Sequence, residues 1–561
     1  MSFRFCVALG AAALLALAGT AVAQQPIVIK FSHVVALDTP KGKGAEYFKK
    51  LAEERTKGRV KVEVYPNSQL YKDGEEMEAL QLGSVQMLAP SVAKFGPLGA
   101  REFEVFDLPY IFDSFAELHK VTEGPVGKQL FQKLESKGIT GLAYWDNGFK
   151  DFSANKALKA PADVKGLKMR IQSSNVLEAE IRALGGIPQK MAFSEVYQGL
   201  QTGVVDGTEN PPSNFYTQKM HEVQKYLTMT DHGVIEYAVI VNKKFWDGLP
   251  ADVRSALESA MKDATKYAND IAKKENDDAL EGVKKSGKTQ IITLTADEKG
   301  SLEKSAGRRF IASRKAASAR TSSSRCTKKP ASSPRLHGCG MIATPLPAPA
   351  PAVAFSCSDA LAAARSGRSG MLKFLDHLEE WLIAFLIAAA TIIVFIAVVH
   401  RYAAGLPIPV LQDWLLAINL SWAQELCIYM FIWMAKFGAA YGVRTGIHVG
   451  VDVLINRLPD SLRRKYVLFG LLSGALFTII VGSLGANYVW AIGHTDQVSA
   501  DLELPLWIVY LCIPLGSYLM CFRFLQVAWS FYKTGELPHH DHGHVEGIED
   551  VDADQPHSLR H

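Results

Sequence analysis

Residues 27–65 read IVIKFSHVVALDTPKGKGAEYFKKLAEERTKGRVKVEVY, and this stretch decides the fold class. Residues 27–32 have the pattern of a strand, and apolar and polar residues alternate in 60–65, as they do in half-buried strands. Between them, Tyr47, Phe48 and Leu51 recur at helical spacing within 44–56. A strand, a helix and a second strand in this order indicate an α/β protein.

The same change of period continues to residue 305. We predict further strands at 85–89, 140–145, 168–172 and 238–241, and helices at 74–83, 174–184, 194–202 and 251–285. The last helix is long and highly charged, which is typical of a helix that crosses the outside of two lobes. Residues 24–305 contain no cysteine, so an ordinary apolar core must hold them together.

Charge is unevenly distributed along the 561-residue chain, whose net charge is only +4. Lys and Arg number 38 against 39 Asp and Glu in residues 24–305, 11 against 1 in 306–370, and 11 against 17 in 371–561. Because the basic excess lies in one segment, we expect no nucleic-acid partner.

The first 23 residues have the composition of a secretory signal peptide. Arg4 is followed by an apolar run over 7–18 and by the small-residue cleavage site Ala21-Val22-Ala23. The run is too short to cross a hydrocarbon core of about 30 Å. We expect the mature chain to begin near Gln24 outside the cytoplasm, with an uncleaved anchor as the alternative.

Motifs of the common enzyme classes are missing from residues 24–305. Lys41-Gly42-Lys43-Gly44 follows a strand, but Ala45 and Glu46 stand where a phosphate-binding loop has Lys and Ser or Thr. Neither a G-x-S-x-G nor an H-E-x-x-H pattern occurs in this region. We therefore expect no enzymatic activity, cofactor or metal, and predict an exported ligand-binding protein with two lobes.

Six ordered motifs give this region a family resemblance. They are Phe31-Ser32-His33, Tyr65-Pro66-Asn67-Ser68-Gln69-Leu70, Leu108-Pro109-Tyr110-Ile111-Phe112, Trp145-Asp146-Asn147-Gly148-Phe149-Lys150, Met169-Arg170-Ile171-Gln172 and the segment from Gln201 to Asn210. Together they resemble the solute-binding subunit of tripartite ATP-independent periplasmic (TRAP) transporters, and most closely its C4-dicarboxylate branch. The resemblance implies a two-lobed α/β periplasmic binding protein over 24–305 that captures a small carboxylate such as malate, succinate or fumarate.

Arg170 is the leading candidate for gripping a ligand carboxylate. Only six of the 38 basic residues in 24–305 are Arg, and Arg170 alone lies in an apolar strand, where a buried charge needs a partner. Its planar guanidinium can donate two parallel hydrogen bonds to a carboxylate, which Lys cannot do. An internal salt bridge is the alternative, and the resemblance favours the ligand.

Five further residues are candidates for the ligand site. Asn210 follows a strand and turn at 204–207 and precedes Pro211-Pro212, which keeps it out of a helix. The resemblance favours carboxylate binding by Asn210 over a role in a turn. Lys150 fits the second carboxylate of a diacid, or is a solvated loop residue. Ser91 and His33 are hydrogen-bonding candidates that could equally serve a turn or the core. Tyr237, like Trp145 and Phe149, could form an apolar wall, although isolated aromatics usually belong to the core.

From Met371 the sequence changes class. Apolar runs at 381–399, 420–441, 466–490 and 504–522 are each long enough to span a bilayer, and they predict an all-α membrane domain of four helices over 371–535. Residues 411–418, with Trp414 among leucines, are expected along the membrane interface. Ala423-Gln424-Glu425, the segment from Arg444 to Val449, and Asp452 resemble the small membrane subunit of the same transporter class.

Four polar residues in this half are candidates for a network between helices or subunits. Glu425 lies in an apolar helix and needs a partner. Arg444, His448 and Asp452 would share one face of a helix, with an ordinary cytoplasmic turn as the alternative. The expected partners of this half are the lipid bilayer and the large TRAP membrane subunit, which must be a separate chain.

Residues 306–370 are basic and show no periodicity. They are either a disordered linker or the product of a reading-frame disruption that joined two adjacent genes.

The positive-inside rule puts the loop containing Arg457, Arg463 and Arg464 in the cytoplasm together with Lys373, whereas the signal peptide places 24–305 in the periplasm. A further transmembrane span between 306 and 371 would be needed to connect the two sides of the membrane. The prolines of 345–351 interrupt the one segment that could form it. We therefore expect the two halves to work as separate polypeptides.

The sequence as a whole predicts a component of a secondary active transporter of the bacterial inner membrane. Its periplasmic domain would pass a carboxylate to the large subunit for uptake driven by an ion gradient, as the resemblance implies. A membrane-anchored ligand sensor or scaffold is the alternative, although no signalling segment follows the last helix. A hydrolase is a distant third, because no nucleophile–base pair is evident.

The tail 536–561, with its His539-His540-Asp541-His542-Gly543-His544 run, is expected to be solvated, with metal binding as the alternative.

Overall fold

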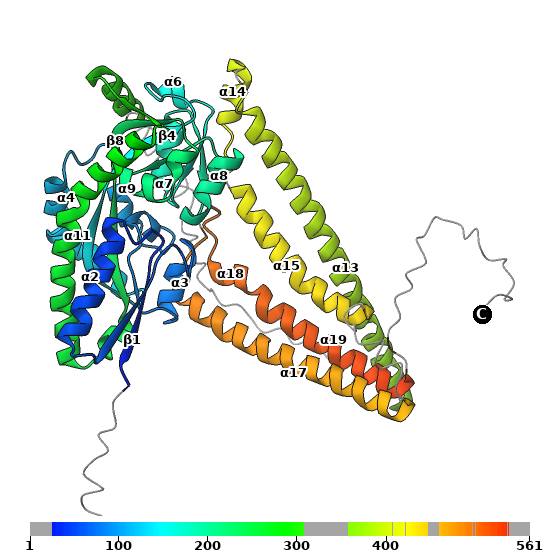
Figure 1. Cartoon of the computed structure of the whole chain (residues 1–561). Coiled ribbons are helices and arrows are strands. Elements are labelled where there is room, and N and C mark those ends of the chain that lie inside the picture. The colour runs from blue at the N-terminus through cyan, green and yellow to red at the C-terminus, as the bar shows by residue number, and fades with distance from the viewer. Residues whose placement is uncertain are drawn as a thin grey trace, which may run out of the picture. The chain divides into compact units, whose positions relative to one another are not determined.

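The computed structural model describes residues 25–307, 357–406, 408–420, 422–446, 459–495, 497–499, 501–535 and 537, with the side chains of 357–376, 409, 460 and 461 excepted. The chain forms two units, one α/β and one helical (Figure 1). The predicted signal peptide, residues 308–356 of the basic segment and the histidine-rich tail lie outside the described residues.

The α/β unit contains a mixed sheet. Within the described residues the strands follow the order β2-β1-β3-β8-β4-β7-β5-β6, with β9 beside β8. Their bounds are β1 (Ile27–Ser32), β2 (Val60–Tyr65), β3 (Met87–Leu88), β4 (Ile139–Ala154), β5 (Lys168–Ile171), β6 (Ile187–Lys190), β7 (Gly207–Asn210), β8 (Tyr226–Asn242) and β9 (Gln290–Thr293). Strands β4 and β8 are much longer than the others and pair antiparallel along their length.

These two long strands join two lobes. Lobe I is the part of the unit that contains β1, β2 and β3, and lobe II is the part that contains β5 and β7. One end of the pair packs with β1, β2 and β3, where Trp145 and Val239 lie in the apolar core of lobe I. The other end packs with β5 and β7, where Phe152 lies in the core of lobe II beside Met169. Register shifts interrupt the pairing between Asp146 and Gly148 and between Lys150 and Phe152. The predicted two-lobed α/β architecture is confirmed.

Helices cover both faces of the sheet. The α-helices are α2 (Pro40–Arg55), α3 (Glu76–Gln81), α4 (Phe115–Thr122), α5 (Pro125–Glu135), α6 (Pro161–Val164), α7 (Asn175–Ala183), α8 (Val196–Thr202), α9 (Pro212–Thr217), α10 (Lys243–Asp247) and α11 (Ala251–Ser286). Short 3₁₀ helices are η1 (Val92–Phe95), η2 (Arg101–Asp107), η3 (Phe193–Glu195) and η4 (Met220–Glu222). Helix α11 lies along α2 (Figure 1) and contributes to the cores of both lobes, as predicted for a crossing helix.

Several predicted elements differ in extent from the structure, and β3, for example, covers only Met87–Leu88 of the predicted 85–89. Helix α2 begins at Pro40, before the predicted 44, because Thr39 caps it by accepting a hydrogen bond from the Gly42 N–H at 3.2 Å. Strands β4 and β8 extend far beyond the predicted 140–145 and 238–241. Their extensions carry buried polar residues such as Asp146 and Glu236, which break the apolar pattern by which a strand is recognised.

The helical unit contains α13 (Cys357–Ala403), α15 (Trp422–Thr445), α17 (Asp460–Gly493), α18 (Leu506–Tyr510) and α19 (Cys512–Thr534). Among the described residues, four segments are long and apolar enough to span a membrane, in agreement with the predicted number: His377–Ala403, Trp422–Thr445, Leu462–Gly493 and Leu506–Thr534. A short helix, α14 (Pro409–Leu416), covers most of residues 411–418, and the location of this segment along the membrane interface stays a prediction. Helix α13 begins at Cys357, inside the segment expected to lack regular structure, because Ala360 to Ala364 are strong helix formers.

Candidate functional site

A small pocket lies between the two lobes of the α/β unit, and three of its lining residues are charged. Arg170 comes from β5 of lobe II, whereas Lys94 of η1 and Asp73, which precedes α3, come from lobe I. The remaining lining residues are Val34, Val35, Ser91, Gln172, Phe193, Asn210, Asn214, Ile235 and Tyr237. Of the candidates named from sequence, the structure brings Arg170, Asn210, Ser91 and Tyr237 together around one space.

Arg170 is buried, with 2% of its surface exposed. Its Nε and Nη2 donate to the carbonyl oxygen of Met191 at 3.0 and 2.8 Å, and its guanidinium lies 5.7 Å from the centre of the Phe193 ring. The carboxylate of Asp73 is 3.8 Å from Nη2. Because a guanidinium carries five N–H donors, Arg170 retains donors for a ligand after binding Met191.

Asp73 and Lys94 form the charged wall that faces Arg170. The Asp73 carboxylate lies 3.4 Å from Lys94 Nζ and accepts a hydrogen bond from the Phe193 N–H at 3.2 Å. Lys94 also pairs with the buried Glu76 at 2.9 Å. Burial would raise the pKa of Asp73, but Lys94 and Arg170 outweigh it and hold this pKa below its usual range. Asp73 therefore links lobe I to lobe II beside the pocket.

Asn210, Tyr237 and Ser91 supply uncharged polar groups. Asn210 is the last residue of β7 rather than a residue after the strand, and its Nδ2 donates to Thr208 Oγ1 at 3.3 Å. The Tyr237 hydroxyl accepts from Asn147 Nδ2 at 3.0 Å and from Asn214 Nδ2 at 3.4 Å, so its own proton remains available for an acceptor. Ser91 caps η1 by accepting from the Ala93 N–H.

Lys150, expected at a second carboxylate, does not line this pocket. It is buried and pairs with Glu209 at 2.7 Å, and Glu209 also contacts His232 Nε2 at 2.9 Å. Burial opposes ionisation of Glu209, but Lys150 and His232 hold its pKa at about 2. The charge of Lys150 is thus balanced within the protein. The sequence could not predict this pair, because Lys150 and Glu209 are far apart along the chain.

His33 is also absent from the lining, although its neighbours Val34 and Val35 belong to it. Burial and the nearby Lys41 lower the pKa of His33 to about 3, so it is neutral at physiological pH. Trp145 and Phe149 pack in or against the cores of lobe I, which leaves Tyr237 as the one wall residue among the three aromatic candidates.

Three buried residues have the donor types of a metal site. Ligand atoms of Glu180, Glu209 and His232 lie within 4.8 Å of one another. The ammonium of Lys150 already lies 2.7 Å from Glu209 and supplies positive charge there, so the arrangement is better explained as a buried ion network than as a cation site.

Several lining residues were not candidates in the sequence: Asp73, Lys94, Gln172, Phe193 and Asn214. Asp73 has the appearance of a turn residue and Lys94 that of a surface lysine. One signal existed for Lys94. It stands three residues after Ser91 behind a buried strand, so both residues fall on one turn of a helix.

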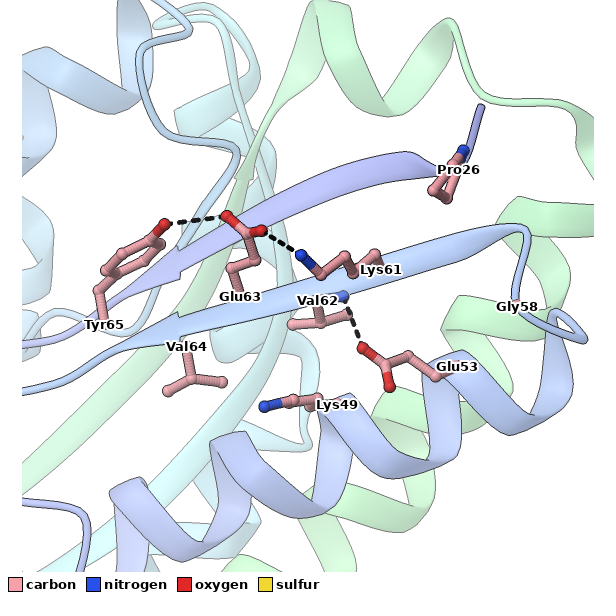
Figure 2. Close-up of a pocket in the computed structure, with 9 residues that line it drawn as sticks. All are labelled: Pro26, Lys49, Glu53, Gly58, Lys61, Val62, Glu63, Val64 and Tyr65. Atoms are coloured by element: carbon pink, nitrogen blue, oxygen red, sulfur yellow. Dashed lines mark hydrogen bonds and ion pairs between the residues drawn. The ribbon is translucent and has the colours of Figure 1, made fainter. Parts of the chain in front are cut away.

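A larger, open depression lies at the outer edge of the sheet, on β2 (Figure 2). Glu53 accepts a hydrogen bond there from the Val62 N–H at 3.0 Å, and Glu63 contacts both Lys61 and the Tyr65 hydroxyl. These side chains protect the edge strand from pairing and converge on no common point. The depression is therefore a weaker ligand site than the pocket between the lobes.

Two of the four polar candidates of the helical unit, Glu425 and Arg444, lie in described residues and have polar partners. Glu425 accepts from the backbone N–H groups of Asp501 and Leu502 at 2.9 and 2.7 Å, and Arg444 pairs with Glu380 at 2.5 Å. His448 and Asp452 lie outside the described residues. A further buried pair, not predicted from the sequence, is formed by Arg523 Nε, which donates to Glu379 at 2.9 Å.

Comparisons with known proteins match the two units separately. The family described as "Bacterial extracellular solute-binding protein, family 7" matches residues 31–308, and "Tripartite ATP-independent periplasmic transporters, DctQ component" matches 390–534. The C4-dicarboxylate-binding periplasmic protein DctP of Rhodobacter capsulatus is 69% identical over 295 residues, which cover 52% of this chain and 88% of that protein. The small permease protein DctQ of the C4-dicarboxylate TRAP transporter from the same organism is 56% identical over 206 residues, covering 33% of this chain and 91% of that protein.

The chain belongs to the TRAP transporter families, with a DctP-type and a DctQ-type unit in one sequence. This confirms the family resemblance. Both are transport families and not enzymes, which confirms the prediction of a non-enzymatic protein.

Solved structures of TRAP solute-binding proteins share the fold of the DctP-type unit. A protein of Shewanella oneidensis with bound succinate is 42% identical, with a TM-score of 0.50, and covers 51% of this chain and 93% of its own. A Pseudomonas aeruginosa protein with bound L-malate is 44% identical, with a TM-score of 0.50, and covers 51% and 99%.

Proposed function

We propose that this chain captures a C4-dicarboxylate in the periplasm and delivers it to a separate large TRAP subunit for uptake driven by an ion gradient. The observation that carries the proposal is the buried guanidinium of Arg170 in the pocket between the lobes, with N–H donors remaining after its bonds to Met191. Asn210, Tyr237 and Ser91 would supply further polar contacts.

The proposed binding mode uses both lobes. One carboxylate would receive parallel hydrogen bonds from Arg170 in lobe II. The other would face Lys94 and the Tyr237 hydroxyl in lobe I. Because the ligand bridges the lobes, its binding would favour the closed arrangement around β4 and β8, and its release would accompany opening. The relatives with bound succinate and L-malate support a diacid of this length.

Calorimetry of the full chain in lipid nanodiscs, titrated with a panel of small acids, tests the ligand. We expect binding of succinate, malate or fumarate in preference to monocarboxylates. Tight binding of a sugar or an amino acid without binding of any C4 diacid would contradict the proposal. Uptake into vesicles that contain this chain and the large subunit, with and without an ion gradient, tests delivery and energy coupling.

We also propose that the two units act as separate polypeptides. Their relatives in Rhodobacter capsulatus are two separate proteins, and each unit covers most of one of them. The test compares uptake by the intact chain with uptake by residues 1–307, extended by the C-terminal segment of the relative, together with residues 371–561. Equal uptake by an intact, uncleaved chain would show that the join is functional and would contradict this expectation.

A further inference from the structure

Behind the proposed ligand pocket lies a buried lysine of the Lys-Gly-Lys-Gly stretch, which only weakly resembles a phosphate-binding loop. Lys41 is fully buried in the first turn of α2. Its Nζ donates to the carbonyl oxygen of Ala89 at 2.9 Å and lies 3.6 Å from the centre of the Tyr237 ring. Within the described residues no carboxylate lies within ion-pair distance of Lys41.

The local structure holds Lys41 in this position. A Cβ atom on Gly42 would lie 2.4 Å from the backbone oxygen of Ala36, and one on Gly44 would lie 3.1 Å from the Trp145 ring. The two glycines of the Lys-Gly-Lys-Gly stretch therefore allow the start of α2 to pack directly on the loop after β1 and on the sheet. This close packing, rather than phosphate binding, explains the pattern and directs Lys41 inward.

Charged and titratable groups lie around Lys41 on several neighbouring elements. Lys94 belongs to η1, Glu76 to α3 and Asp73 to the loop before it, while His33 follows β1 and Tyr237 belongs to β8. Burial first, and Lys94 second, lower the pKa of Lys41 to about 7, against the opposing effect of Glu76 and Asp73. His33 is neutral near pH 7, and burial raises the pKa of Tyr237.

The charges around the pocket balance without Lys41. Arg170 and Lys94 are positive and Asp73 and Glu76 are negative, so an incoming diacid dianion would meet no net compensating charge. A protonated Lys41 would supply one positive charge. It would act through Tyr237, because a cation over the ring strengthens the hydroxyl as a hydrogen-bond donor to the ligand.

We propose that Lys41 is a positioning residue for the second ligand carboxylate and takes up a proton when a C4 diacid binds. The inference rests on the proposed function. Below the pKa of Lys41 in the free protein, the amine is already charged, so no proton is taken up and affinity is highest. Between this pKa and the higher pKa in the complex, affinity falls as pH rises, by up to about tenfold per pH unit for one proton.

Calorimetry with succinate tests the proposal on the full chain in lipid nanodiscs. Titrations in buffers of different ionisation enthalpy, at pH values from 6.5 to 9, measure the protons taken up per ligand bound. We expect uptake to approach one proton above pH 7 in the natural protein. The Lys41→Met variant should bind succinate more weakly, with no proton uptake and a flat pH profile. Lys43→Met is the matched control, because Lys43 lies on the same helix and pairs with Glu275 away from the pocket.

Three results would overturn the inference. Succinate binding without proton uptake in the natural protein would do so and requires no variant to fold. Undiminished uptake in Lys41→Met would assign the proton to another group, of which Glu76 is the first candidate because burial raises its pKa. Failure of every C4 diacid to bind the natural protein would refute the proposed function itself, and this inference with it.

Discussion

The two halves of the chain each bury an arginine, and the partners of these arginines differ. Arg523 in α19 is fully buried, and its Nε and Nη2 meet the Glu379 carboxylate at 2.9 and 2.8 Å. Arg170 in β5 donates instead to an uncharged backbone carbonyl, and its nearest carboxylate is 3.8 Å away. The charge of Arg523 is balanced inside the protein, whereas that of Arg170 is only partly balanced. A buried arginine with an incomplete set of partners is thus the better candidate for ligand binding.

The largest expected effect comes from breaking the pair in the helical half. Arg523→Leu leaves Glu379 buried without this counter-charge, so we expect a loss of roughly 3–5 kcal/mol in the free energy of unfolding. The double variant Arg523→Leu with Glu379→Leu should recover most of it. Denaturant titration in mixed micelles measures both values. A single variant as stable as the natural protein would show that Arg523 does not have the structural role assigned to it.

The second-largest effect is expected at Arg170, where a substitution tests whether the buried guanidinium binds the ligand. Arg170→Lys keeps the charge but loses the fork that matches a carboxylate, so we expect the fold to be retained and succinate affinity to fall. A hydrogen bond between charged groups contributes about 1.5–3 kcal/mol, which corresponds to roughly ten- to a hundredfold in Kd. Calorimetry provides the Kd and circular dichroism the check on folding. Unchanged affinity would return Arg170 to the role of an internal structural cation.

The smallest effect is expected at Arg182, a partly exposed arginine on α7. Its Nε donates to Glu178 at 3.0 Å in an i, i+4 ion pair. Such pairs contribute about 0.3–0.5 kcal/mol, so Arg182→Lys should change neither stability nor succinate affinity measurably. It serves as the matched control for Arg170→Lys. A large loss of affinity in this variant would show that the effect of Arg170→Lys is not specific to the guanidinium in the pocket.

Much of the fold followed from local patterns. The strand at 27–32, the helix at 251–285 and four apolar spans were predicted from periodicity and length, and each corresponds to an observed element. Arg170 stood out because a charged residue in an apolar strand is costly without a partner. The long strands β4 and β8 were underpredicted because their buried polar residues face other polar residues from distant parts of the chain.

The amino-acid sequence by itself determined the class of each half, the position of several elements and the choice of Arg170 as a candidate. Only the tertiary structure decided which side chains share the pocket. Lys94, Asp73 and Arg170 come from three separate parts of the chain, and Lys150, another candidate for a ligand carboxylate, pairs with Glu209 instead. The physical reason is the range of the forces. Periodicity reflects local burial along one element, whereas the partner of a buried charge is fixed by how the elements pack, which no single segment contains.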